Sequence, residues 1–409
     1  MTTKRSSLER RWSAAKHEQG ETGLFDTMNL RIALADANTA AAEATATANS
    51  ATSTPFASVP VIDISSFVVP NSTSTNKLEE TQTQAQAQAQ AHCVDAVVTA
   101  CQHLGFFKII GHGIDPTIIE KVLHASAHFF ADQAMATKVL ASDPNNAMHG
   151  YYATENIHAA LGRDGAADRR EGYAIGPSTN CDFYHNYWPP SPEPTPTATT
   201  SELEDTATRY YDAMEHLEQI LHVILTRALK HITEQAALPD TWLQQAVGRH
   251  RGLLRLNYYP PAVTAAPGNF GAHSDWSTFT ILYPTGPGLE VIQQEEWRQV
   301  EYTPATDPST FVINIGDILE RWSNGEFTSS IHRVQCCGVP NTTTTTTATT
   351  AAPAARQSLA YFCAEIVDPC DTTIVQPLLK PQARRVFDED LSIVEYMTRN
   401  FEGMTGKKV

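Results

Sequence analysis

Hydrophobic and polar positions change their pattern at about residue 250. Beyond this point, short, largely apolar runs are separated by turn residues such as Pro, Gly and Asn. The runs are "LLRLNYYP", "STFTILYP", "GLEVIQ", "WRQVEY", "TFVINIGDIL", "SSIHRVQCC" and "RQSLAYFCAEI". Short runs of this kind, bounded by turn residues, predict strands. Seven short strands joined by turns predict a sandwich or jelly roll rather than βαβ units.

The pattern before residue 250 is mainly helical, with strands at "VPVIDISSF" and "FFKIIGHGI". The Gln-Ala repeat at 83–91 precedes an apolar helical segment, and we interpret it as helix-permissive filler. Asp115 and Pro116 form a predicted helix start, and Ser201 with Glu204 matches a capping box after a Pro/Thr linker at 189–200. Behind that box lies an apolar stripe that predicts core packing: Met214, Leu217, Leu221, Ile224 and Leu225.

These patterns predict an α+β, mainly β protein, built as one integrated domain with a helical N-terminal region. We expect a disordered extension over 1–57, an N-terminal region of helices and first strands over 58–190, a core-flanking helix over 201–245, the β-rich core over 250–370 and a helical segment over 371–409. The Thr/Ala stretch at 341–355 is predicted to be a low-complexity loop within the core.

Composition and charge narrow the class of function. A net charge of −16 argues against nucleic acid or an anionic membrane as the main partner. No apolar run approaches the roughly 20 residues that span a bilayer, and acidic residues near the N-terminus (Glu9, Glu18 and Glu21) disfavour a transit peptide. The seven cysteines lack a C-x-x-C spacing, which favours free thiols in a reducing compartment. We expect a cytoplasmic monomer that acts on a small molecule.

Candidate metal ligands occur in the segment "GAHSDWSTFTIL" at 271–282. Residues i and i+2 of a strand share a face. If this segment is a strand, the side chains of His273 and Asp275 converge on one side of the sheet. Alone, such a pair is more often a hydrogen-bonded surface pair. His332, on a later predicted strand, adds a second imidazole, and two histidines with one carboxylate form the facial triad that holds non-haem Fe(II). Other histidines leave the third ligand open on spacing alone.

A candidate anion receptor follows at "RQS". Arg356 and Ser358 lie two apart on the last predicted strand, and a guanidinium beside a hydroxyl suits a carboxylate. Asn257 and Tyr259 have the same spacing in "RLNYYPP", whereas Tyr258 is predicted to be a core aromatic. Three further arginines could bind an acidic substrate, but we favour a solvated face for them: Arg163, Arg169 and Arg170.

Taken together, the chain resembles the iron- and 2-oxoglutarate-dependent dioxygenases of the isopenicillin N synthase-like superfamily, over roughly 58–400. The phrases that carry the resemblance are "ACQHLGFFKIIGHGI", "RREGYAIG", "LRLNYYPP", "HSD", "FVINIGDILERWSNGEFTSSIHRV" and "RQSLAYF".

This resemblance implies a double-stranded β-helix that holds iron through His273, Asp275 and His332. It implies that Arg356 and Ser358 bind the distal carboxylate of 2-oxoglutarate, with Asn257 and Tyr259 near the cosubstrate. The implied chemistry uses Fe(II), 2-oxoglutarate and O2, releases succinate and CO2, and oxidises a small organic substrate, usually by hydroxylation. No catalytic residue is expected beyond the metal centre.

Two alternatives stay open at the level of sequence. An oxidase of the same superfamily, acting by ring closure without 2-oxoglutarate, would use the Arg356 and Ser358 pair for the carboxylate of its own substrate. A metal-binding scaffold without catalysis would keep the ligands but serve a partner through the Thr-rich loop.

Overall fold

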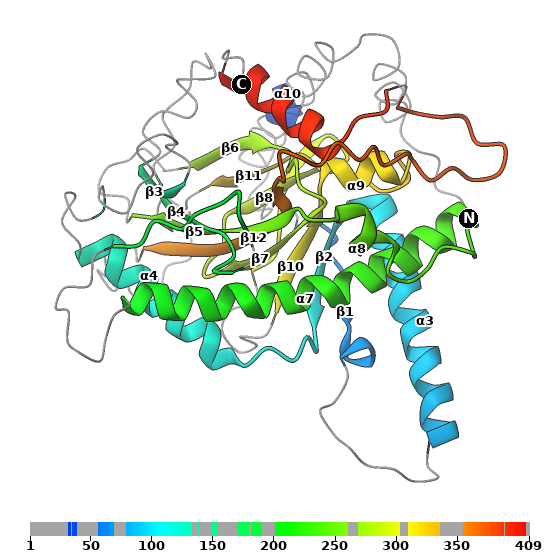
Figure 1. Cartoon of the computed structure of the whole chain (residues 1–409), viewed down its shortest axis with the longest axis horizontal. Coiled ribbons are helices and arrows are strands. Elements are labelled where there is room, and N and C mark those ends of the chain that lie inside the picture. The colour runs from blue at the N-terminus through cyan, green and yellow to red at the C-terminus, as the bar shows by residue number, and fades with distance from the viewer. Residues whose placement is uncertain are drawn as a thin grey trace, which may run out of the picture.

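Two β-sheets form the centre of the computed structural model (Figure 1). The main sheet has eight strands in the order β1 (Val61–Asp63), β2 (Phe106–Ile110), β10 (Phe311–Ile315), β7 (Phe279–Pro284), β12 (Arg356–Ile366), β5 (Arg251–Tyr259), β4 (Glu171–Ile175) and β3 (Gly150–Ala153). The second sheet has four, in the order β6 (Asn269–His273), β11 (His332–Gln335), β8 (Leu289–Gln293) and β9 (Glu296–Gln299). This arrangement confirms the predicted jelly roll.

The structure describes only part of the chain. The described residues are 32–33, 35–38, 56–68, 79–132, 138, 149–153, 170–179, 181–189, 201–260, 269–302, 310–335, 355–387 and 389–405. Residues 190–200 of the predicted Pro/Thr linker and residues 341–354 of the predicted Thr/Ala loop lie outside these ranges.

Both faces of the main sheet are buried. On β5, Leu254 and Leu256 point into the core that the helices cover, whereas Tyr259 packs between the two sheets. On β2, Phe107 and Phe106 divide in the same way. Because successive side chains of a strand point to opposite faces, each strand needs apolar residues on both sides. This explains why the strands read as nearly continuous apolar runs.

Three helices cover the outer face of the main sheet: α3 (Glu79–His103), α4 (Pro116–Asp132) and α7 (Glu202–Thr233). The long α7 runs across the sheet (Figure 1). Its first turn is capped as predicted, because Ser201 Oγ accepts a hydrogen bond from the Glu204 backbone N–H at 3.1 Å. The predicted stripe on α7 is fully buried, which confirms its role in the core.

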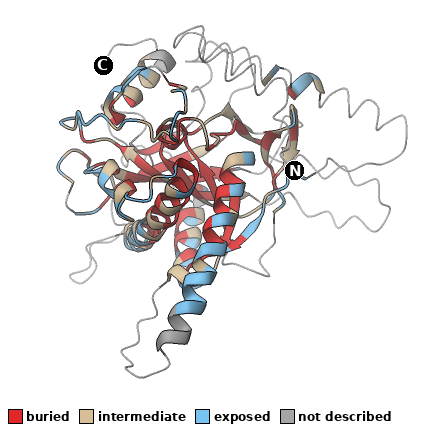
Figure 2. Cartoon of the chain, turned by 90° about the vertical axis from the view of Figure 1, so that its right-hand side faces the viewer, coloured by how far each residue is buried: buried red, intermediate tan, exposed pale blue. Residues whose placement is uncertain are grey.

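Helix α3 extends beyond the core at its N-terminal end (Figure 2). The described residues of the Gln-Ala repeat are exposed except for the half-buried Gln90, and burial begins near Cys93. Gln86 and Gln90 donate hydrogen bonds to the carbonyl of Ser66. The repeat therefore extends a helix without contributing apolar side chains to the core, as predicted.

Two features differ from the prediction. The sequence pattern did not predict β3 and β4, which extend the main sheet beyond β5. Residues 35–38, within the extension predicted to be disordered, are helical, and Ala35 is buried beside Trp297. Asp36 accepts hydrogen bonds from Trp297 Nε1 and Arg333 Nη1. Disorder was therefore the wrong prediction for these residues, because polar contacts to the second sheet hold them.

The predicted free thiols are observed at every described cysteine: Cys93, Cys101, Cys181, Cys363 and Cys370. Among the helices that the structure describes, none combines the length and the apolar character needed to cross a bilayer.

A buried polar cluster lies where α7 packs on β12. Tyr361 Oη donates a hydrogen bond to Glu218 Oε2 at 2.7 Å, and His222 Nε2 lies 3.5 Å from Glu218 Oε1. Burial raises the pKa of Glu218 to about 7 and lowers the pKa of His222 to about 3. The folded protein therefore keeps a proton on Glu218 at pH values where the unfolded chain has lost it.

We predict that Glu218 makes the protein less stable as the pH rises from 4.5 to about 7, the interval between its ordinary and its folded pKa. The sign follows because the folded state binds more protons there, so the free energy of unfolding falls with pH. The loss is on the order of 3 kcal/mol. In urea unfolding across this range, Glu218→Gln should match the parent near pH 4.5 and exceed it near pH 8. An unchanged pH dependence would contradict this assignment.

Candidate metal and cosubstrate site

Two strands of the second sheet bring the two candidate histidines together. His273 is the last residue of β6 and His332 the first of β11, and the antiparallel register pairs them directly. Their ring centroids are 4.4 Å apart. Each Nε2 lies 3.6 Å from Asp275 Oδ1, and one ligand atom from each of the three residues falls within 4.8 Å of the others. The predicted triad therefore does converge.

The reason for the convergence differs from the prediction. Strand β6 ends at His273, so Asp275 lies in the turn toward β7 rather than on the same strand. The Asp275 backbone carbonyl accepts a hydrogen bond from the Asp317 N–H at 2.8 Å, which fixes this turn against the start of α9 (Asp317–Trp322). The turn packs so closely that a Cβ at Gly316 would lie 2.0 Å from the Ser277 carbonyl oxygen. Turn geometry, not strand alternation, aims the carboxylate.

Both imidazoles are oriented through their Nδ1 atoms. His273 Nδ1 lies 2.7 Å from the Gly271 carbonyl, and His332 Nδ1 lies 3.0 Å from the Ser330 carbonyl. A carbonyl only accepts, so Nδ1 carries the proton and each Nε2 keeps a lone pair. This tautomer is the one that a metal requires, and the backbone selects it on both rings.

The Asp275 carboxylate is held by one of its two oxygens. Oδ2 accepts hydrogen bonds from Thr280 Oγ1 at 2.6 Å and from Asn314 Nδ2 at 2.7 Å. Thr280 and Asn314 face each other across the β7 and β10 pairing. With Oδ2 occupied, Oδ1 is left facing the two Nε2 atoms.

Electrostatics favour an ionised Asp275 carboxylate beside a neutral His332 imidazole. Burial would raise the pKa of Asp275, but His332, His273 and the Thr280 hydrogen bond outweigh it and hold that pKa well below its usual range. Burial lowers the pKa of His332 to about 4, and the neighbouring His273 contributes to the shift. At neutral pH Asp275 therefore carries a negative charge and His332 Nε2 a lone pair. With His273 Nε2 beside them, these atoms form the donor set that a divalent cation needs.

The candidate anion receptor lies on the main sheet. Strand β12 pairs with β5 so that Arg356 faces Tyr259 and Ser358 faces Asn257. Arg356 Nε donates to the carbonyls of Pro287 at 3.0 Å and Gly286 at 3.3 Å, and the guanidinium lies 4.9 Å from the Tyr259 ring centroid.

The two terminal nitrogens of Arg356 are buried and have no hydrogen-bond partner among the described residues. A buried guanidinium with unpaired donors is costly, so this geometry indicates a bidentate anion as the missing partner. The backbone carbonyls hold Nε and thereby present the other two nitrogens as a fork.

Arg170 connects the receptor to the histidines. Its Nη1 donates to Asn257 Oδ1 at 2.6 Å, and Asn257 Nδ2 lies 3.5 Å from Ser358 Oγ. Its guanidinium lies 3.7 Å above the Phe270 ring, which lies 4.2 Å from the His273 ring.

The interpretation of Arg170 as a residue of a solvated face was therefore wrong, because this side chain is buried. The other two arginines of that set, Arg163 and Arg169, lie outside the described residues.

Sequence reasoning missed Thr280 and Asn314, although a signal for both exists. Each is a polar residue within an otherwise apolar strand, in "FTIL" and "FVINI". A buried polar side chain needs a hydrogen-bond partner, and the Asp275 carboxylate provides it for both.

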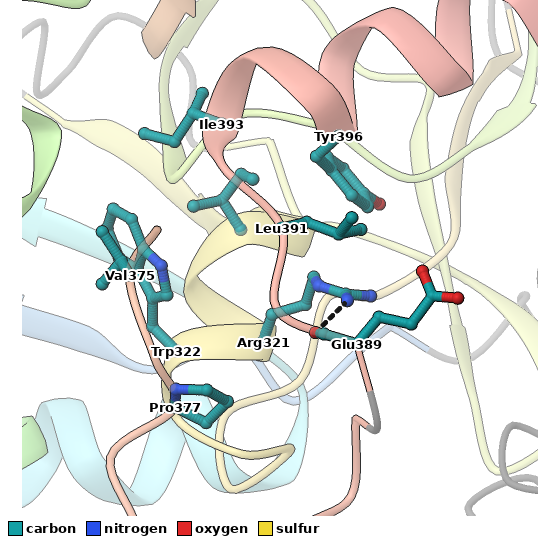
Figure 3. A pocket seen from close by; sticks show the side chains of 9 residues that line it. Arg321, Trp322, Val375, Pro377, Glu389, Leu391, Ile393 and Tyr396 are labelled. Carbon is teal, nitrogen blue, oxygen red and sulfur yellow. Dashed lines mark hydrogen bonds between the residues drawn. The ribbon is translucent and has the colours of Figure 1, made fainter. Parts of the chain in front are cut away.

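The C-terminal helix α10 (Ile393–Thr405) is also bonded to the ligand segment. Asp317 Oδ2 accepts hydrogen bonds from Tyr396 Oη at 2.9 Å and from Ser274 Oγ at 3.1 Å. Ser274 lies between the first two candidate ligands. Figure 3 shows Tyr396 and Ile393 of α10 beside Arg321 and Trp322 of α9, where they line a small pocket. Through Asp317, the turn that carries Asp275 is tied to the C-terminal end of the chain.

The residues present fit both Fe(II) and 2-oxoglutarate. Two imidazole nitrogens and one carboxylate oxygen are the ligand set of non-haem iron sites that keep adjacent positions open. A dicarboxylate fits the fork of Arg356.

Comparisons with known proteins identify the family to which the chain belongs. The model of the 2OG-Fe(II) oxygenase superfamily matches residues 251–365. The model described as non-haem dioxygenase in morphine synthesis N-terminal matches residues 59–191. The fold is similar to that of a full-length Neurospora crassa protein solved in complex with alpha-KG and 5-formyluracil. The TM-score is 0.61 and the identity 22%, with 85% of this chain and 96% of that chain covered.

Two curated relatives are more similar in sequence. Clavatol oxidase claD of Penicillium crustosum is 29% identical, over 68% of this chain and 83% of its own. The 2-oxoglutarate-dependent dioxygenase caaD of Aspergillus niger is 30% identical, over 68% of this chain and 79% of its own. With both regions matched and the ligand set in place, the chain belongs to the family of Fe(II)- and 2-oxoglutarate-dependent dioxygenases.

Proposed function

We propose that this dioxygenase holds its iron through His273 Nε2, Asp275 Oδ1 and His332 Nε2. The observation that carries the proposal is the convergence of these three atoms. In each residue the other polar atom of the side chain already makes a hydrogen bond, which leaves the converging atom as the ligand. A ligand set oriented before the metal arrives loses little entropy on binding. Surface clusters of acidic and histidine residues lack such orientation.

Arg356 and Ser358 are proposed to bind the distal carboxylate of 2-oxoglutarate. Support comes from the two unpaired terminal nitrogens of Arg356 and from the register that places Ser358 on the same face of β12. Asn257 positions the Ser358 hydroxyl, and the Tyr259 ring supports the guanidinium by a cation–π contact. Asn257 and Tyr259 are therefore proposed as positioning residues of the cosubstrate site.

When bound, iron and 2-oxoglutarate would supply, with O2, the oxidation of a small organic substrate, with release of succinate and CO2. The residues of this chain orient the ligand atoms, bind the cosubstrate carboxylate and line the space beside the metal. We propose hydroxylation as the outcome for the substrate, and no further acid or base is needed from the protein.

Two alternative functions were left open by the sequence, an oxidase without 2-oxoglutarate and a scaffold without catalysis, and both are disfavoured. The curated relatives that match over most of their length include several named 2-oxoglutarate-dependent dioxygenases, which disfavours an oxidase that works without this cosubstrate. A scaffold without catalysis has no need for a receptor beside its metal ligands.

We further propose a cytoplasmic location and a monomeric state. The free thiols of the described cysteines support a reducing compartment. We also propose a division of the chain into five regions. They are an extension at 1–57, an N-terminal region at 58–190, a flanking helix at 201–245, the dioxygenase core at 250–370 and a C-terminal helical segment at 371–409.

Anaerobic addition of Fe(II) and 2-oxoglutarate should give a weak visible charge-transfer band, and oxygen should then release succinate. His332→Ala should abolish both the band and succinate release, because two ligands hold the iron weakly. His231→Ala, on the exposed side of α7, is the control and should behave like the parent. Retention of the full band by the His332 variant would contradict the assignment.

Arg356→Lys should weaken 2-oxoglutarate binding on the order of 10- to 100-fold, because an ammonium cannot replace the bidentate fork. The measurement is titration of the charge-transfer band with 2-oxoglutarate at saturating Fe(II). Arg333→Lys provides the control, since Arg333 is ion-paired to Glu290 and Asp36 and has no part in the receptor. Equal affinities for the two variants would exclude Arg356 as the receptor.

Asn314→Ala should lower the affinity for Fe(II) about 10- to 100-fold while leaving all three ligands in place. The reason is that the Asp275 carboxylate loses one of the two hydrogen bonds that orient it. Competition with a metal chelator under anaerobic conditions measures the effect. An unaltered Fe(II) affinity in a folded variant would show that Thr280 alone orients the carboxylate.

A further inference from the structure

A second group of polar side chains lies inside the jelly roll and is not used by the metal or the cosubstrate. It consists of Arg255 on β5, Glu365 on β12 and Tyr152 on β3, and we call it the Arg255 cluster. Arg255 shares the inner face of β5 with Asn257 and Tyr259, because these residues are two and four positions apart. At about 3.4 Å per residue, Arg255 and Tyr259 lie roughly 13 Å apart along the strand.

The cluster adjoins the candidate metal ligands. The Arg255 guanidinium lies 5.0 Å from the Phe362 ring centroid. Phe362 pairs across the sheet with Thr280, and the Thr280 hydroxyl donates a hydrogen bond to the Asp275 carboxylate. Burial raises the pKa of Glu365, and Asp275 and His273 are close enough to contribute to its shift.

Each member of the cluster has an unused hydrogen-bonding atom. Arg255 Nε, Glu365 Oε2 and Tyr152 Oη are buried and have no hydrogen-bond partner among the described residues. The ion pair itself is loose, with Arg255 Nη2 3.4 Å from Glu365 Oε1. In the ion pair of Arg333 and Glu290, whose side chains are similarly exposed, Arg333 Nε lies only 2.7 Å from Glu290 Oε2. Unpaired buried polar atoms cost on the order of 1–3 kcal/mol each, so the arrangement lacks a partner.

The backbone is distorted at the point where it presents Glu365. The β12 register shifts between Phe362 and Ile366, and Ala364 has a φ of 62°. A residue other than glycine in this region is strained, and such bulges commonly re-aim side chains near functional sites. Without the bulge, Glu365 would continue the alternation of Tyr361 and Cys363, which face the helix side of the sheet.

Tyr152 reaches the cluster across a glycine. Strand pairing places Tyr152 opposite Gly172 and Ala174 opposite Arg255. A Cβ at Gly172 would lie 2.3 Å from Tyr152 Cζ, so only glycine lets the ring lie there. The ring is therefore directed over β4 toward β5.

We propose that the Arg255 cluster is the recognition site for the substrate's polar group, and that this group is neutral and carries a hydrogen-bond donor next to an acceptor. The proposal rests on the proposed function, because it places the substrate beside the iron. The arginine and glutamate neutralise each other, so a charged group has no counter-ion there. When Glu365 is ionised, its Oε2 can only accept a hydrogen bond, whereas Arg255 Nε and Tyr152 Oη can each donate one. A lactam edge or a hydroxyl beside a ketone has this pattern, whereas a carboxylate does not.

The test measures binding of simple probes to the protein loaded anaerobically with Fe(II) and 2-oxoglutarate. Thermal stabilisation is titrated with 2-pyridone, 2-hydroxyacetophenone, their N-methyl and O-methyl counterparts, and benzoate. We expect at least one neutral donor–acceptor probe to bind about 10-fold more tightly than its methylated counterpart and than benzoate. The two pairs separate lactam from hydroxy-ketone recognition. Tighter binding of benzoate, or no preference in either pair, would overturn the proposal.

Variants locate the preference in the cluster. Glu365→Gln should reduce the preference for the unmethylated probe to within about 2-fold, and Tyr152→Phe, which removes only a hydroxyl, should reduce it partially. Glu290→Gln is the matched control, since Glu290 has similar exposure and lies in an ion pair outside the cluster. An unchanged preference in both cluster variants would overturn the proposal.

The charge-transfer band separates the two levels of inference. If the band is retained in Glu365→Gln and the preference is lost, both the proposed function and the recognition site hold. If the parent itself gives no band, the proposed function fails before the substrate question arises.

Discussion

The direct pairing of His273 with His332 across β6 and β11 is the constraint on which the site depends. A one-residue slip in that register would turn one imidazole to the opposite face of the sheet. The register is held from both sides, because β11 also pairs with β8, and Leu289, Val291 and Val334 pack in the core between the sheets. The energy that fixes the histidines therefore comes mainly from apolar burial between the two sheets.

The carboxylate depends on the other sheet. Asp275 lies in a turn, and turns are less rigid than strands, but Thr280 of β7 and Asn314 of β10 hold its Oδ2. The backbone of the same turn is bonded to α9, and Ser274 is linked through Asp317 to α10. The site is thus assembled at the junction of the two sheets, and each sheet supplies different groups. Helix α7 buries the outer face of the main sheet and keeps those supports in place.

Sequence patterns predicted the parts that depend on periodicity and local chemistry. Short runs between turn signals identified β5 and β7 through β12, and residue type and spacing identified the Arg356 and Ser358 pair. His332 was assigned by the resemblance to the family, because spacing alone left other histidines open. What could not be predicted depends on contacts between distant segments. Asp275 was placed on a strand although it lies in a turn, and Arg170 was placed in solvent although Asn257 and Phe270 bury it. The bulge at Ala364 has no signal in the residues around it, because alanine rarely adopts a positive φ.

The central claim is that one iron ion is held by the three converging atoms, with the cosubstrate carboxylate on Arg356. X-ray diffraction at the iron absorption edge, from crystals grown anaerobically with Fe(II) and 2-oxoglutarate, tests it most directly. We expect a single anomalous peak within about 2.0–2.2 Å of His273 Nε2, Asp275 Oδ1 and His332 Nε2, and a carboxylate on the two terminal nitrogens of Arg356. An iron peak elsewhere in the chain, or a cosubstrate bound away from Arg356, would contradict it.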